Sequence, residues 1–200
     1  MKPNRSKVVI LAIALTAVCS WAGYAENLNI RNCTWCHGIS AQGLPPAPQL
    51  AGQQRRYLEN QLRDFGHHTR DNPYSQQYMW SVGENLSPER VHDLATYFSL
   101  LPPRAANDGD QGLAALGRTI YQIGMPESNI VACVVCHGPN GEGVGEIPRL
   151  GGLGYTYLKR RLETWGEGFH TSAKLPMASV ASKLSPNQID ALASYLSFLE

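Results

Sequence analysis

The sequence predicts an all-α protein built from two tandem domains, and three observations support this fold class. Leu and aromatic residues recur at helical spacing over 53–65 and 155–165, while no segment alternates strictly enough to predict a strand. The second half of the chain repeats the first at a nearly constant offset. A stretch containing Pro and Gly, 102–109, separates the two copies and is typical of a linker.

The offset between the two copies identifies equivalent positions. It is 100 in the first part of each copy and 98 in the second, so the second copy lacks two residues in the loop between Gly66 and Met79. Equivalent pairs include His37 and His137, Pro48 and Pro148, Tyr57 and Tyr157, Met79 and Met177, and Ser87 and Ser185. We expect a leader at 1–25, a first domain at 26–102, a linker at 103–110 and a second domain at 111–200.

Two matched helix starts support the repeat. Ser87-Pro88 and Ser185-Pro186 each place an N-cap serine before a proline at the first helical position, and Gln188 adds a capping box to the second copy. Amphipathic stripes of apolar residues follow both starts. Core packing is the expected role of these stripes. A domain of this size buries little apolar area alone, so a bound cofactor would add to its core.

The N-terminal segment has the features of a secretory signal. Three basic residues, Lys2, Arg5 and Lys7, precede an uncharged run, and small residues near Ala25 form a cleavage site, with cleavage after Ala22 as an alternative. We therefore expect export to the periplasm. A retained membrane anchor is the other interpretation, because residues 8–25 are uncharged over 18 positions, the lower limit for a membrane span. A lipid anchor on Cys19 fits less well.

Charge excludes nucleic acid as a partner. The full chain has 17 basic and 16 acidic residues, and removal of the leader leaves 14 basic residues against 16 acidic ones. This balance gives no basic surface for phosphates. Docking to protein partners is expected to use local patches rather than a strong overall field.

A duplicated five-residue motif indicates the chemistry. Cys33-x-x-Cys36-His37 returns as Cys133-x-x-Cys136-His137, and these motifs contain four of the five cysteines. Two thiols one helical turn apart can add across the two vinyl groups of one haem, while the adjacent imidazole ligates its iron. The sequence thus predicts two covalently bound haem c groups, with His37 and His137 as iron ligands.

Two other interpretations of the cysteines fit their spacing less well. A four-cysteine zinc site needs its two halves about 15–20 residues apart, whereas the motifs lie about 100 residues apart, and neither histidine would be needed. A thioredoxin-like redox pair needs a βαβ unit, and the sequence gives no sign of one.

The second axial ligand of each iron is assigned by comparing the four methionines of the chain. Met1 lies in the leader and Met125 is unmatched, whereas Met79 and Met177 occupy equivalent positions. Both are therefore predicted iron ligands, although a single Met usually fills a core gap. The remaining histidines, expected to be solvated surface residues, are His67, His68, His92 and His170. Thioether ligation raises the reduction potential, which suits the oxidising end of an electron-transfer chain.

A matched proline follows each motif. Pro48 and Pro148 both supply a carbonyl without an N–H group, which suits them to accept the Nδ1 hydrogen of the axial histidine. That contact would fix the histidine tautomer and strengthen the iron bond. A plain turn proline is the alternative interpretation at both positions.

Together these motifs resemble the dihaem cytochrome c4 family, in which two class I cytochrome c domains are fused in tandem. The resemblance covers nearly all of the chain after Ala25 and includes the segment Pro48-Gln49-Leu50-Ala51-Gly52-Gln53. It implies two domains each wrapped around one covalent haem, with the propionates facing each other across the domain interface. It also implies periplasmic electron transfer from a quinol–cytochrome c reductase or a dehydrogenase towards a haem–copper terminal oxidase.

The resemblance leaves two other functions open. A similar dihaem fold serves as the cytochrome subunit of flavin-dependent sulfide dehydrogenases. A dihaem peroxidase needs one haem with an open coordination position, whereas the matched methionines predict two closed ones. We therefore expect no catalytic residue and an electron-transfer protein rather than an enzyme.

One feature departs from the family pattern. Gly117 and Tyr121, within 112–124, are placed as in the N-terminal helix of class I cytochromes, which crosses the last helix. If cleavage follows Ala25, the first half keeps only 26–32 before its motif, which is too short for that helix.

Overall fold

The computed structural model describes residues 30–169 and 176–200, and every regular element in those two ranges is a helix. Within them, only isolated bridges such as Leu44 to Ala47 have strand-like pairing. The predicted all-α fold is confirmed. The elements in chain order are α2 (Arg31–His37), α3 (Arg55–Gly66), α4 (Pro73–Tyr78), α5 (Trp80–Glu84), α6 (Pro88–Leu100), α7 (Gln111–Ile123), the 3-10 helix η1 (Pro126–Ser128), α8 (Val134–His137), α9 (Tyr155–Gly166), α10 (Met177–Ala181) and α11 (Pro186–Ser197).

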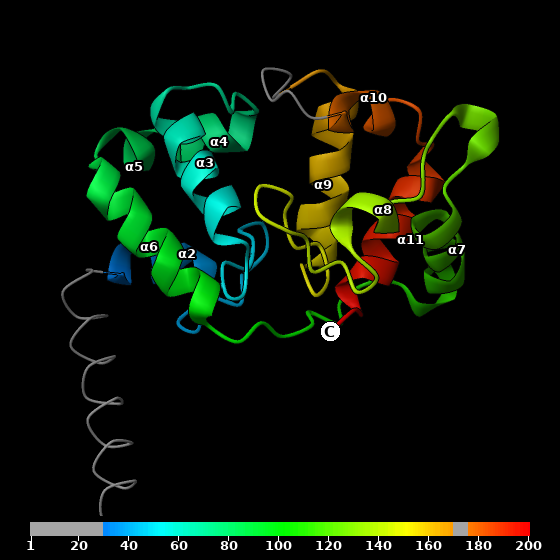
Figure 1. Ribbon diagram of the computed structural model, residues 1–200, viewed down its shortest axis with the longest axis horizontal. Coiled ribbons are helices and arrows are strands. Elements are labelled where there is room, and N and C mark those ends of the chain that lie inside the picture. The colour runs from blue at the N-terminus through cyan, green and yellow to red at the C-terminus, as the bar shows by residue number, and fades with distance from the viewer. Residues whose placement is uncertain (1–29, 170–175) are drawn as a thin grey trace, which may run out of the picture.

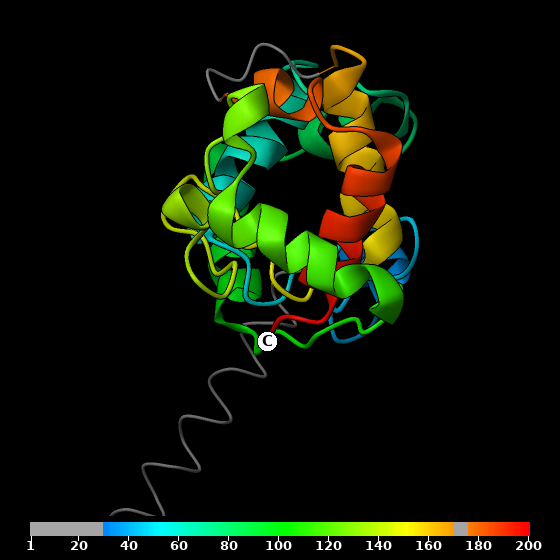
Figure 2. The same ribbon diagram turned by 90° about the vertical axis from the view of Figure 1, so that its right-hand side faces the viewer.

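The two halves form two helical domains that lie side by side, with α2 to α6 in one and α7 to α11 in the other (Figure 1). Seen end-on, α7 crosses in front of the second domain (Figure 2). The leader prediction falls on residues outside the described ranges, as does His170. Among the helices of 30–169 and 176–200, none has the length and apolar composition required to cross a membrane.

The first domain is organised around α3 and α6, whose apolar faces meet. Leu58 of α3 packs with Leu94, Ala95 and Phe98 of α6 in one buried cluster. Ser87 begins α6 as predicted, because its side chain accepts a hydrogen bond from the Arg90 N–H group. This packing leaves the N-terminal end of α3 at the boundary with the second domain.

The second domain repeats this plan with α9 and α11 and adds α7. Leu158 of α9 packs with Leu192 and Leu196 of α11. Ser185 and Gln188 form the predicted capping box at the start of α11. The matching of α3 with α9, α5 with α10, and α6 with α11 follows the offsets in the sequence.

Helix α7 crosses α11 at a glycine, as the sequence led us to expect. A Cβ atom on Gly117 would collide with the backbone carbonyl group of Ala191 and approach Tyr195 Cβ to 2.7 Å. Only glycine therefore allows the two backbones this close. Tyr121, one turn later, is fully buried, and its hydroxyl donates to the Gly138 carbonyl at 2.6 Å. The crossing helix thus also supports the loop that follows the second haem motif.

The linker between the domains is held against the second domain. The Ala106 N–H group donates to the Gly152 carbonyl, and the Asn107 N–H group donates to the Ser197 carbonyl. The Asp108 carboxylate accepts from the N–H group of Tyr155 at the start of α9. These bonds hold the linker in one position on the surface of the second domain.

Candidate haem sites

The first site is built on the short helix α2, which contains Cys33, Cys36 and His37. Residues three apart on a helix face the same side, so both thiols are presented together. Cys33 is partly buried and Cys36 is exposed. His37 ends the helix and is only 7 % exposed. This arrangement gives one buried imidazole beside one partly buried and one exposed sulfur atom.

The second site repeats the first on α8. Cys133 is the N-cap residue of this helix, and Cys136 and His137 lie in its single turn. Cys133 is again the partly buried thiol, Cys136 the exposed one, and His137 is buried. The two motifs therefore have the same local geometry, although α8 is the shorter helix.

Both histidines contact the matched prolines. His37 Nδ1 lies 2.6 Å from the Pro48 carbonyl oxygen, and His137 Nδ1 lies 3.0 Å from that of Pro148. Because a carbonyl oxygen only accepts, Nδ1 must carry the proton in each ring, which leaves Nε2 with a free electron pair for a metal. The hydrogen bond expected from the sequence is thus present at both sites, and neither proline is a plain turn residue.

Burial favours the neutral form of both histidine rings and the protonated form of the two partly buried thiols, Cys33 and Cys133. Burial lowers the pKa of His37 and of His137, and the proline carbonyls oppose this only in part. Burial raises the pKa of Cys33, and it raises the pKa of Cys133 to about 11. A neutral imidazole is the form that ligates iron.

The described residues show neither of the features on which the competing interpretations of the cysteines depend. Across 30–169 and 176–200, no three His, Cys, Asp or Glu side chains gather where they would hold a metal ion. The same residues contain no strand from which a thioredoxin-like βαβ unit could be built.

The two predicted methionine ligands occupy equivalent places in the fold. Met79 lies between α4 and α5, and Met177 is the first residue of α10. Each thus stands at the start of a helix of five residues, and each is partly buried. Met125, unmatched in the sequence, packs against the second core. Ligation by Met79 and Met177 stays a prediction that this symmetry favours.

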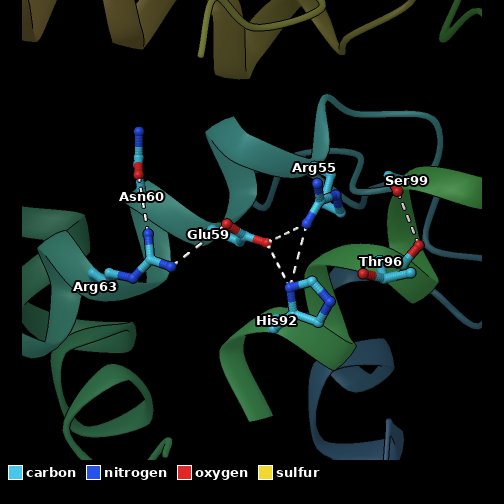
Figure 3. Close-up of polar contacts among 7 residues, drawn as sticks. All are labelled: Arg55, Glu59, Asn60, Arg63, His92, Thr96 and Ser99. Carbon is cyan, nitrogen blue, oxygen red and sulfur yellow. Dashed lines mark hydrogen bonds and ion pairs between the residues drawn. The ribbon is translucent and has the colours of Figure 1, made fainter. Parts of the chain in front are cut away.

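The remaining described histidines, His67, His68 and His92, are exposed, and two of them pair with carboxylates. His92 Nδ1 lies 3.0 Å from the Glu59 carboxylate, which also pairs with Arg55 and Arg63 (Figure 3). His68 pairs with Glu84 at 2.6 Å and stacks on Trp80.

The interface between the two domains contains two buried arginines, Arg70 and Arg161, that were not predicted from the sequence. Arg70 is 7 % exposed, and its guanidinium group contacts the neutral oxygens of Gln61 at 2.6 Å and Tyr157 at 3.4 Å. Its Nε atom is buried and donates to no residue of the described chain. Arg161 is also buried, and its burial, reinforced by the charge of Arg70, lowers its pKa to about 10.

The charges and dipoles of Tyr157, Tyr57 and Asp64 oppose the effect of burial and raise the pKa of Arg70. Haem carries two propionates, and Arg70 and Arg161 are residues that could hold such anions at the interface. The sequence signal was weak: position 61 is Gln where its partner at 161 is Arg.

Comparisons with known proteins agree with this geometry. The Cytochrome c family model matches residues 25–101 and 114–200. The chain is 33% identical to cytochrome c4 of Pseudomonas aeruginosa over 94% of each chain. It belongs to the dihaem cytochrome c4 family. A solved structure of Acidithiobacillus ferrooxidans cytochrome c4 superposes with a TM-score of 0.79 at 34% identity, covering 84% of this chain and 99% of that one.

A relative with a more specific name is equally similar. The thiosulfate dehydrogenase electron acceptor of Thiomonas intermedia is 34% identical, covering 94% of this chain and 89% of its own length. Two tandem cytochrome c domains bind two covalently attached haem c groups, so this cytochrome c4 is a dihaem electron carrier.

Proposed function

We propose that this cytochrome c4 carries electrons through the periplasm from an upstream quinol–cytochrome c reductase or dehydrogenase to a haem–copper terminal oxidase. The observation that supports this most directly is the duplicated proximal site, in which a buried neutral histidine donates to a proline carbonyl. Two similar sites suit electron exchange better than they suit an enzyme, which needs one specialised open site.

Each part of the protein has a separate task in this function. Cys33 and Cys36, with Cys133 and Cys136, would attach the two haems through their thiols. His37 and His137 would ligate iron through Nε2, and we assign Met79 and Met177 as its thioether ligands. Each haem, when bound, would supply an iron that exchanges one electron. Imidazole and thioether together favour the reduced metal, which places the carrier at the oxidising end of a chain.

The proposed compartment rests on the leader and the haem attachment. The basic residues, uncharged run and small-residue site within 1–25 are those of an export signal. Thioether attachment to Cys-x-x-Cys-His is chemistry of the exported compartment. Mass measurement on the native protein tests this, because a mature chain beginning at Glu26 fits the proposal and a chain retaining residues 1–25 contradicts cleavage.

The carrier function is tested with purified protein made together with a haem-attachment system. We expect two haems per chain, rapid reoxidation by membranes that contain the terminal oxidase, and no turnover of peroxide. The alternative of a dihaem peroxidase predicts turnover. One haem per chain, or reoxidation no faster than the spontaneous rate, would contradict the proposal.

A second candidate concerns the electron donor. Similarity to the Thiomonas intermedia protein named as an electron acceptor favours a thiosulfate dehydrogenase as the upstream enzyme. Stopped-flow mixing with such an enzyme and thiosulfate should reduce both haems. Co-purification with a flavoprotein and reduction by sulfide would instead favour the sulfide dehydrogenase subunit.

A further inference from the structure

The first domain reaches into the proximal side of the second haem site through one buried side chain. Gln53 lies just before α3 and is 4 % exposed. We propose that Gln53 is a positioning residue for the second haem, because its amide holds and polarises the peptide group whose carbonyl binds His137. This inference rests on the assignment of His137 as an iron ligand.

The contacts of Gln53 define the orientation of its amide. Its Oε1 accepts from the Arg149 N–H group at 2.7 Å and from the Gln54 N–H group at 2.8 Å, and its Nε2 donates to the Arg149 carbonyl at 2.9 Å. Two donors around one atom and an acceptor beside the other exclude the flipped amide. The side chain therefore pairs with both backbone groups of Arg149, as a neighbouring strand would.

The paired N–H group belongs to the peptide that matters for the haem. The Arg149 nitrogen and the Pro148 carbonyl are the two ends of one planar peptide unit. That carbonyl accepts from His137 Nδ1 at 3.0 Å. A continuous hydrogen-bonded path thus runs from Gln53 through one peptide to the axial histidine.

Hydrogen bonds in such a path strengthen one another. A peptide that donates at its N–H end becomes a better acceptor at its carbonyl end. A better acceptor for Nδ1–H makes the imidazole a stronger ligand. A stronger imidazole donor favours the oxidised metal, so the Gln53 contact should lower the reduction potential of the second haem. It acts on the longer of the two proximal hydrogen bonds, 3.0 Å against 2.6 Å.

This contact runs from the first domain to the second haem site. The residue equivalent to Gln53 in the second copy is Leu153, which has no amide and packs in the second core. Among residues 30–169 and 176–200, the second domain makes no such contact to the peptide of Pro48. Gln53 therefore distinguishes the two haem sites, and the first haem serves as an internal reference.

Gln54 provides a matched control. Its Nε2 donates to the carbonyls of Glu142 at 2.8 Å and Gly143 at 3.2 Å, in the loop that precedes Pro148. It crosses the same interface without touching the peptide of Pro148 and Arg149. Loss of Gln54 should loosen the interface to a similar degree and leave the path to His137 intact.

The test compares holoprotein of the wild type, Gln53→Leu, Gln53→Glu and Gln54→Leu by redox titration. We expect Gln53→Leu to raise the potential of the second haem and leave the first unchanged. Gln53→Glu keeps a stronger acceptor for the Arg149 N–H group, while an oxygen replaces the donor to the Arg149 carbonyl, and it should shift that potential the opposite way. Gln54→Leu should move neither. NMR of the reduced protein should show a shift of the His137 Nδ1–H signal, with His37 unaffected, in Gln53→Leu.

Each result decides the proposal. Equal shifts of both haems, shifts of one sign in both Gln53 variants, or an equal effect of Gln54→Leu would show that Gln53 only supports the interface. If Gln53→Leu yields no holoprotein, the Gln53→Glu potential and its NMR shift decide alone. The haem count and visible spectrum of the wild type test the carrier function separately, so the two ideas fail in distinguishable ways.

Discussion

Substitution of Gly117 by Ala tests the helix crossing that builds the second domain. Helix propensity alone predicts that alanine stabilises α7 by about 1 kcal/mol relative to glycine. The structure predicts the opposite sign, because the added Cβ would meet the Ala191 carbonyl group, which is backbone and cannot turn aside. A more stable Gly117→Ala protein would follow from helix propensity, whereas a less stable one would follow from tertiary packing.

The expected size follows from the two opposing terms. Overpacking a core costs about 1–3 kcal/mol, against a propensity gain of about 1 kcal/mol, so the net loss reaches about 2 kcal/mol. For a domain of 60–100 residues, a loss of about 2 kcal/mol lowers Tm by roughly 8–16 °C. Calorimetry on the holoprotein should show this in the transition of the second domain only.

Ala115→Gly is the control, since Ala115 lies on the exposed side of the same helix. It should destabilise by about 1 kcal/mol through propensity alone. A Gly117→Ala protein with an unchanged or higher Tm would refute the close approach of α7 and α11.

Three further predictions concern the haem sites and the domain packing. Met79→Ala or Met177→Ala should leave the haem attached but open to cyanide or carbon monoxide, which an optical titration detects; absence of new ligand binding would contradict the assignment at that site. Cys33→Ser should weaken attachment of the first haem only, and mass spectrometry of the two halves after proteolysis checks which haem is lost. Asp190, held by Lys159 at 2.6 Å, has its pKa lowered mainly by that contact. A lowered pKa in the folded state means that the carboxylate stabilises the fold above its unfolded pKa of about 4 and loses this effect as pH falls through the folded value. Asp190→Asn should therefore cost up to about 1 kcal/mol at pH 7 and nothing at low pH, measured by denaturant unfolding at several pH values; a pH-independent cost would point to packing instead.

Much of the fold was predictable because the signals are local. The Ser-Pro starts of α6 and α11 and the stripes that follow them depend only on neighbouring residues, and both helices formed where expected. Gly117 could be assigned because family resemblance gave its place a structural meaning. The haem motifs needed no tertiary information, since two thiols and a histidine within five residues define the chemistry themselves.

The interface could not be predicted in the same way. Gln53 and Arg149 are 96 positions apart, and Arg70 and Tyr157 are 87 apart. Nothing in the neighbourhood of a glutamine or an arginine tells whether it faces water or another domain. Only a comparison of the two copies gave a hint, at positions 53 and 153 and at 61 and 161.

The amino-acid sequence alone determined that this chain forms two helical copies, each with its own haem attachment motif, because covalent chemistry and helix periodicity act over a few residues. The tertiary structure decided which side chains meet between the copies. It placed two arginines in a shared interior and one glutamine behind the second axial histidine, since burial and hydrogen-bond partnership depend on how separate domains pack.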